Sequence, residues 1–187
     1  MQILSLIVVA VIAIAVIPGF AFGQSAPLES KVQEMQNYMR MNETGKALNA
    51  AERAVQMARG EMGHDRAYLA NVISSLADLY VLHQFYAQAI PLYGEVISIR
   101  ESEIGLDDPE LGPAYNNIAL VYKTLGHYED AEPYVQRAIA VKEKNFGSDH
   151  ESLAPSLEIY AKVLRETERA ELAEETAARA KTIRESQ

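Results

Sequence analysis

The sequence contains no cysteine and no tryptophan, although it has 187 residues and 49% of them are hydrophobic. Without thiols the chain can form neither a disulfide framework nor a cysteine-based metal site, so its folding must depend on packed apolar surface. The length is that of one domain. The formal net charge is -9, which would repel the phosphates of nucleic acid and argues against DNA or RNA as a partner.

Charge is absent from residues 3–22, a run long enough to cross a bilayer or to form the apolar core of a secretory signal. A Pro-Gly pair within the run ends the helix just before residues 21–23, where small residues suit a signal peptidase. We therefore predict that residues 1–23 are a signal peptide. The mature protein would then begin at Gln24 and be periplasmic or secreted.

Two alternatives remain open for this run. The residues before it, Met1-Gln2, lack the Lys or Arg that normally orients insertion, so residues 3–22 could instead be an uncleaved membrane anchor. A buried helix of a soluble protein is disfavoured, because nothing else in the chain is apolar enough to cover this run on every side.

The rest of the sequence repeats itself, since Gly63, Gly105 and Gly147 recur at one constant interval. Small and aromatic residues recur in the same register: Ala47, Ala89, Ala131 and Ala173; Ala77, Ala119 and Ala161; Tyr38, Tyr80 and Tyr122. A period in this range, with small residues and one large ring at fixed offsets, is typical of a helical solenoid. After a linker at 24–27, the period divides residues 28–187 into four repeats at about 28–64, 65–106, 107–148 and 149–187.

Turn chemistry sets the expected limits of the helices. Asp65, Asp107 or Asp108, and Asp149 can accept the free N–H groups that open a helix, and Pro109 suits a first helical position. The recurring glycines lie where a left-handed residue would end the preceding helix. We predict eight helices, at 28–41, 44–61, 66–83, 86–103, 109–125, 128–145, 150–167 and 170–186.

Small residues explain how the two helices of one repeat would pack. Ala119 and Ala131 flank the turn at 125–127, and a methyl group at both places lets the helices approach to about 8–10 Å. We expect larger residues to fill the seam around this contact, namely Ile118, Tyr122, Val135 and Ala138. The recurring tyrosines are therefore interpreted as structural, and not as the lining of a ligand cavity.

Three segments of the third repeat resemble the tetratricopeptide repeat: residues 115–122 (YNNIALVY), 125–132 (LGHYEDAE) and 136–139 (QRAI). With the connection at 147–150 (GSDH), the 42-residue spacing is similar to the longer variant found in kinesin light chains and many bacterial repeat proteins. The first repeat is a degenerate match. The resemblance implies an all-α fold, a right-handed superhelical solenoid of antiparallel helix pairs.

The first repeat differs from the others in its methionines, because five of the six in the chain lie there. Leu28, Val32, Met35 and Met39 follow a 4-3-4 spacing, which predicts an amphipathic first helix packed on its neighbour. The alternative is an adaptable, methionine-rich surface for a partner.

No motif indicates catalysis. The four histidines fall in or beside turns of different repeats, without the H-E-x-x-H pattern of a zinc protease. The acidic residues at 168–175 open the last predicted helix, where carboxylates suit the positive end of the dipole. Gly45-Lys46 lacks the upstream glycine of a P-loop. We therefore expect no catalytic, cofactor-binding or metal residues, and a protein that is not an enzyme.

The family resemblance implies a concave groove lined by the first helix of each repeat. Asn117 matches the family's groove asparagine, whose amide can bond both donor and acceptor of an extended peptide. In the fourth repeat Glu158-Ile159 stands where the pattern has Asn-Asn. The groove positions carried onto this chain are Asn71, Ser75, Asp78, Asn116, Asn117, Leu120, Lys123, Lys162 and Arg165, of which the last three would form a basic strip.

These features predict a protein–protein interaction module, exported from the cytoplasm, whose groove binds a protein or peptide, for example an acidic extended segment. The alternative is a structural or assembly subunit of a cell-envelope complex. Such a subunit would form homo-oligomers through the terminal helix 170–186, or be held in the membrane by residues 3–22. A monomer that captures a ligand favours the module, and concentration-dependent oligomers favour the subunit.

Overall fold

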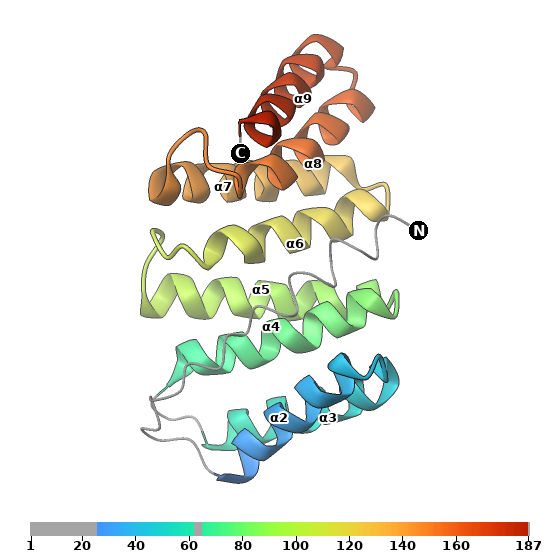
Figure 1. The fold of residues 1–187 in the computed structure, drawn as a ribbon, viewed down its shortest axis with the longest axis vertical. Coiled ribbons are helices and arrows are strands. Elements are labelled where there is room, and N and C mark those ends of the chain that lie inside the picture. The colour runs from blue at the N-terminus through green and yellow to red at the C-terminus, as the bar shows by residue number, and fades with distance from the viewer. Residues whose placement is uncertain (1–25, 62–64, 187) are drawn as a thin grey trace. The chain divides into compact units, whose positions relative to one another are not determined.

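The computed structural model describes residues 26–61 and 65–186 (Figure 1). These residues form helices and no strand, and every predicted helix is found with its ends within three residues of the predicted ones. The helices are α2 (Ala26–Arg40), α3 (Thr44–Glu61), α4 (Arg66–Leu82), α5 (Tyr86–Glu103), α6 (Leu111–Thr124), α7 (Tyr128–Phe146), α8 (Leu153–Glu166) and α9 (Ala170–Glu185).

The apolar run at 3–22 and the predicted cleavage site before Gln24 lie outside the described residues, as do Met62, Gly63 and His64. Among the helices that the structure describes, none combines the length and the apolar character that crossing a membrane requires. The prediction of a signal peptide therefore stays a prediction.

The chain divides into an N-terminal unit, residues 1–99, and a C-terminal unit, residues 100–187. In the N-terminal unit α2 packs on α3 and α3 on α4. In the C-terminal unit α6 packs on α7, α7 on α8 and α8 on α9, and α6 also contacts α8. This last contact brings together the first helices of the third and fourth repeats, which is where the sequence predicts part of a groove.

Two kinds of helix signal are confirmed. The carboxylate of Asp65 accepts a hydrogen bond from the backbone N–H of Tyr68 (2.9 Å) and caps α4. Gly105 and Gly147 follow helix ends with φ of 107° and 90°, in the region that side chains with a Cβ rarely adopt. At these two described positions, the glycine period therefore does mark the end of a helix.

Two helices begin two or three residues later than predicted, and the aspartates expected to cap them do not do so. Asp108 accepts a hydrogen bond from the backbone N–H of Glu110 (3.0 Å) and pairs with Arg100 (2.8 Å), so a turn occupies this region and α6 begins only at Leu111, not at Pro109. Asp149 does not cap α8, which begins after Ser152.

The core of the C-terminal unit forms around the predicted close approach. Ala119 and Ala131 are both 0% exposed and belong to one cluster with Val135, Ile159 and Val163. The prediction for the two alanines is thus confirmed. Ile159, which stands where the family pattern has a groove asparagine, is buried in this cluster, since a large apolar side chain gains by leaving water.

The first helix of the N-terminal unit is amphipathic, as its spacing predicts. Leu28 and Met35 are buried in α2, whereas Met41, in the turn that follows, is exposed. Of the methionines of the first repeat that the structure describes, Met35 thus belongs to the core and Met41 to the surface.

Candidate functional site

In the N-terminal unit, the predicted groove residues do not form an open surface together. Ser75 is 4% exposed, and its hydroxyl donates to the carbonyl of Asn71 one turn earlier (3.0 Å). The hydroxyl of Ser75 is therefore hydrogen-bonded within α4. Asp78 accepts a hydrogen bond from Tyr93 Oη (2.5 Å), which ties α4 to α5. Of the three residues, Asn71 alone has an exposed side chain.

In the C-terminal unit, three predicted residues of α6 follow one another along α8. Asn116, Leu120 and Lys123 are spaced i, i+4, i+7 and so share one face of the helix. Asn116 Oδ1 accepts a hydrogen bond from Ser156 Oγ (2.8 Å), and Leu120 packs against the cluster that holds Ile159. Asn117 is half-buried and lies about 100° further round α6.

The far end of this face carries the predicted cations. Burial lowers the pKa of Lys123, the positive charge of Lys162 lowers it further, and the carboxylate of Glu158 opposes both. The structure therefore brings Lys123 and Lys162 near each other. The predicted residues of both helices, Asn116, Asn117, Leu120, Lys123, Lys162 and Arg165, are called the α6–α8 surface below.

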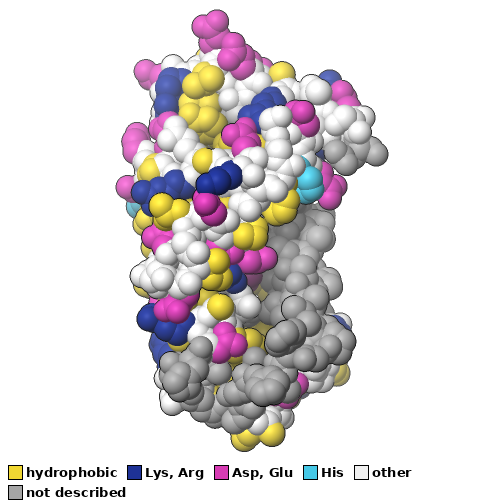
Figure 2. Space-filling model, turned by 90° about the vertical axis from the view of Figure 1, so that its left-hand side faces the viewer, with side chains coloured by type: hydrophobic (Ala, Val, Ile, Leu, Met, Phe, Trp, Pro, Cys, Tyr) yellow, Lys and Arg dark blue, Asp and Glu magenta, His cyan; other side chains and the backbone are white. Residues whose placement is uncertain are grey.

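Carboxylates accompany the cations of this surface. Lys162 donates to Glu166 one turn later, and this hydrogen bond raises the pKa of Lys162. Arg165 pairs with Glu174 of α9 (3.0 Å). Figure 2 shows the same mixing on the face that it draws, where Lys and Arg lie among Asp and Glu. Two of the three cations of the predicted basic strip, Lys162 and Arg165, are thus in exposed ion pairs. Such pairs contribute only about 0–1 kcal/mol each, so a charged ligand can compete for them.

A buried lysine supports the α6–α8 surface from behind. Lys142 of α7 is 6% exposed, and its ammonium donates to the carbonyl of Ser152 and to Ser156 Oγ (both 2.8 Å). Gly112 of α6 leaves room for its stem, since a Cβ there would lie 3.0 Å from Lys142 Cγ. Burial among neutral partners lowers the pKa of Lys142 to about 8.

The repeat register shows why no carboxylate in the described part of the chain pairs with this lysine. The equivalent position in the preceding repeat is Arg100, which is also buried but pairs with Asp108 (2.8 Å). The position equivalent to Asp108 in the next repeat is His150, whose ring contacts Ser152 and stacks on Phe146. The sequence interpretation overlooked Lys142, although comparing the two repeats position by position reveals the missing aspartate.

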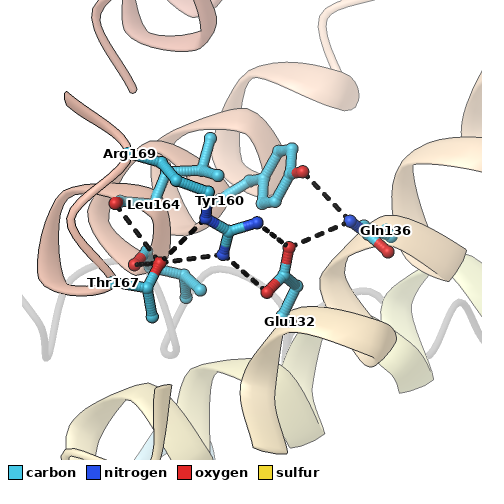
Figure 3. Close-up of polar contacts among 7 residues, drawn as sticks. Glu132, Gln136, Tyr160, Leu164, Thr167 and Arg169 are labelled. Atoms are coloured by element: carbon cyan, nitrogen blue, oxygen red, sulfur yellow. Dashed lines mark hydrogen bonds and ion pairs between the residues drawn. The ribbon is translucent and has the colours of Figure 1, made fainter. Parts of the chain in front are cut away.

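A second network that the sequence interpretation missed joins the last three helices (Figure 3). Arg169, just before α9, donates to both carboxylate oxygens of Glu132 on α7 (2.7 and 2.6 Å) and to Thr167 Oγ1 at the end of α8. Gln136 donates to Glu132 and to Tyr160 Oη. The two-pronged contact fixes the start of α9 against α7.

The described part of the chain offers a shallow cleft and no metal site. Residues 26–61 and 65–186 contain no group of three His, Asp or Glu side chains that could hold a metal ion. A shallow cleft of about 510 Å³ lies between α8 and α9, and alanines and residues of both charges line it, among them Arg165 and Glu158. The α6–α8 surface and this neighbouring cleft are therefore the candidate binding region.

Comparison with known proteins agrees with this architecture. The family model described as tetratricopeptide repeat matches residues 82–144 and 110–186. No curated protein sequence matches the chain.

Solved structures share the fold at low sequence identity. BtubC (BKLC) from P. vanneervenii has 20% identity and a TM-score of 0.78 over 89% of this chain and 67% of its own. A putative kinesin light chain with nearly identical TPR-like repeats from Podosopora anserina has 17% identity and a TM-score of 0.72 over 98% of this chain and 87% of its own. Aspartyl phosphate phosphatase F from Bacillus subtilis has 24% identity and a TM-score of 0.73 over 86% of this chain and 40% of its own. The all-α fold of stacked helix pairs that the sequence predicts is thereby confirmed.

Proposed function

Because the chain belongs to the tetratricopeptide repeat family, we propose that it is a binding module that holds an extended protein or peptide segment on the α6–α8 surface. The observation that carries the proposal is the alignment of Asn116, Leu120 and Lys123 along one face of α6, with Lys162 of α8 close to Lys123. This face offers an amide, an apolar contact and two cations in sequence, which suits a peptide backbone with acidic side chains.

The ion pairs of the surface set how such a ligand binds. Carboxylates of the ligand replace Glu166 beside Lys162 and Glu174 beside Arg165, so each new contact is an exchange. The gain per contact is therefore small, and selectivity comes from several contacts at once. Asn117 adds a hydrogen bond to the backbone of the ligand.

The test uses a fluorescein-labelled hexaglutamate peptide and fluorescence anisotropy. We expect Asn117→Ala to weaken binding roughly 2- to 10-fold, as expected for one hydrogen bond. The pair Lys162→Glu with Arg165→Glu should abolish binding and lower Tm only slightly, because the two exposed ion pairs that it removes contribute about 0–1 kcal/mol each. About 0.5 M salt should weaken the wild-type complex. Lys46→Glu with Lys144→Glu is the matched control, because it makes the same change of charge at exposed lysines outside the candidate binding region.

Binding that survives the double reversal and high salt would overturn the proposal. Sedimentation of the same samples distinguishes the other role expected from the sequence, since an assembly subunit forms oligomers whose size increases with protein concentration.

The place of action is part of the proposal. We propose that the protein works outside the cytoplasm after cleavage before Gln24, which the uncharged run at 3–22 supports. Sequencing the N-terminus of native material tests this, and an intact Met1 in a membrane fraction would instead show an anchored protein.

A further inference from the structure

The inference concerns the side-chain amide of Asn116, and it rests on the function proposed above. An asparagine amide presents a carbonyl on one side and an NH2 group on the other, so its orientation decides whether a ligand meets an acceptor or a donor. In this chain the orientation depends on Ser156 and on the buried Lys142.

The direction of the hydrogen bonds starts at the lysine. An ammonium group has three donors and no acceptor, so Ser156 Oγ must accept in its 2.8 Å contact with Lys142 Nζ. Ser156 is 0% exposed, and its single proton therefore needs an acceptor inside the protein. The acceptor that it meets is Asn116 Oδ1, also at 2.8 Å.

This order leaves the other side of the amide for a ligand. Asn116 is half-buried, and its Nδ2 has no hydrogen-bond partner among the residues that the structure describes. Rotating the amide would place NH2 against the hydroxyl of Ser156 and deprive its proton of an acceptor, which costs free energy in a buried site.

We infer that Lys142, acting through Ser156, fixes the Asn116 amide with its NH2 group toward the ligand, so that this position selects a hydrogen-bond acceptor, a main-chain carbonyl or a carboxylate. Lys142 and Ser156 are positioning residues in this arrangement, and Asn116 makes the contact. The selection is specific to this site, because the equivalents of Ser156 and Asn116 in the preceding repeat are Ala114 and Ser74.

The side-chain signals of Asn116 test the orientation without any ligand. In asparagine-labelled protein, the NH2 pair of Asn116, identified by its loss in Asn116→Ser, should have an order parameter near that of rigid backbone, about 0.85. We expect it to fall below about 0.6 in Ser156→Ala and to fall, by less, in Lys142→Met. Ser156→Thr keeps the hydroxyl and should restore it.

Lys144→Met is the matched control, since Lys144 is an exposed lysine close by on the same helix and pairs with Asp107. It should leave the Asn116 signals unchanged. An order parameter that is the same in wild type, Ser156→Ala and Lys142→Met overturns the inference, as does a fall in Ser156→Ala without any in Lys142→Met.

Binding of the hexaglutamate peptide tests the selectivity. Ser156→Ala should weaken binding about 2- to 10-fold, and Ser156→Thr should restore it. If the Lys162→Glu with Arg165→Glu pair abolishes binding while Ser156→Ala binds like wild type, the inference is wrong and the proposed function stands. If the wild type itself does not bind, the proposed function fails, and the order parameters alone decide whether the relay orients Asn116.

Discussion

Replacing Lys142 by methionine should remove a step in the pH dependence of stability. The pKa of Lys142 falls from 10.5 to about 8 on folding. At about 1.4 kcal/mol per unit, burying the charged lysine costs about 3 kcal/mol at neutral pH, where folded and unfolded states are both protonated. Between the two pKa values only the unfolded state holds the proton, so the free energy of unfolding rises with pH across this window.

The Lys142→Met variant cannot show this rise. At pH 7 it escapes the cost of the buried charge but leaves the carbonyl of Ser152 and the hydroxyl of Ser156 without a donor, which costs about 1–3 kcal/mol. The two effects largely cancel, so the stability of wild type and variant at pH 7 should be similar. The wild type should then gain about 3 kcal/mol over the variant as the pH rises to about 10.5.

Urea unfolding at steps between pH 7 and about 10.5 measures the difference, and subtracting the two curves removes the groups that titrate alike in both proteins. The exposed Lys144→Met is the control, and its curve should run parallel to wild type. Parallel curves for wild type and Lys142→Met would show that Lys142 is not buried as a cation, and the reasoning about its network would fail with it.

Three further predictions concern packing, the junction of the last helices and the core of α2. Ala119→Leu should overpack the cluster around Ala131 and lose about 1–3 kcal/mol, whereas Lys123→Leu on the α6–α8 surface should change Tm little; equal small shifts would refute the packing. Arg169→Met should lower Tm by breaking the fork to Glu132, more at low salt than at high salt, unlike the exposed Lys181→Met. Because Arg169 lowers the pKa of Glu132, their ion pair stabilises the fold above pH 4.5, the usual pKa of a glutamate, and this stabilisation disappears as the pH falls through the lowered pKa. Acid unfolding curves that coincide for wild type and Arg169→Met would contradict this. Met35→Ala should cost about 2–5 kcal/mol in urea unfolding and the exposed Met41→Ala almost nothing, and similar losses would mean that α2 is not packed as described.

Much of the fold could be predicted from the sequence, because the signals that define it are local. The regular spacing of Gly105 and Gly147, the carboxylate of Asp65 before α4 and the paired alanines Ala119 and Ala131 each act within one turn or one helix pair. The late start of α6 could not be predicted, since Asp108 could have capped the helix but instead pairs with Arg100 and accepts a hydrogen bond within the preceding turn.

The family resemblance indicated the residues of the α6–α8 surface, Asn116, Leu120 and Lys123 among them. The helix period adds that these three residues share one face of their helix. The helix period does not determine how deeply a side chain is buried. Ser75 and Ile159 occupy positions expected to face the groove, but both are buried.

Only the tertiary structure decided what each polar group meets. Lys142 and Ser156 are 14 positions apart, and Ser156 and Asn116 are 40 apart, so their contact exists only once three helices have packed. The partner of Arg165 could not be predicted either, since Glu174 lies on the next helix, whereas the i, i+4 spacing of Lys162 and Glu166 is visible in the sequence. A hydrogen bond requires two atoms within about 3 Å, and spacing along the chain brings atoms that close only within a helix or a turn; between helices, the packing of side chains decides which donor meets which acceptor.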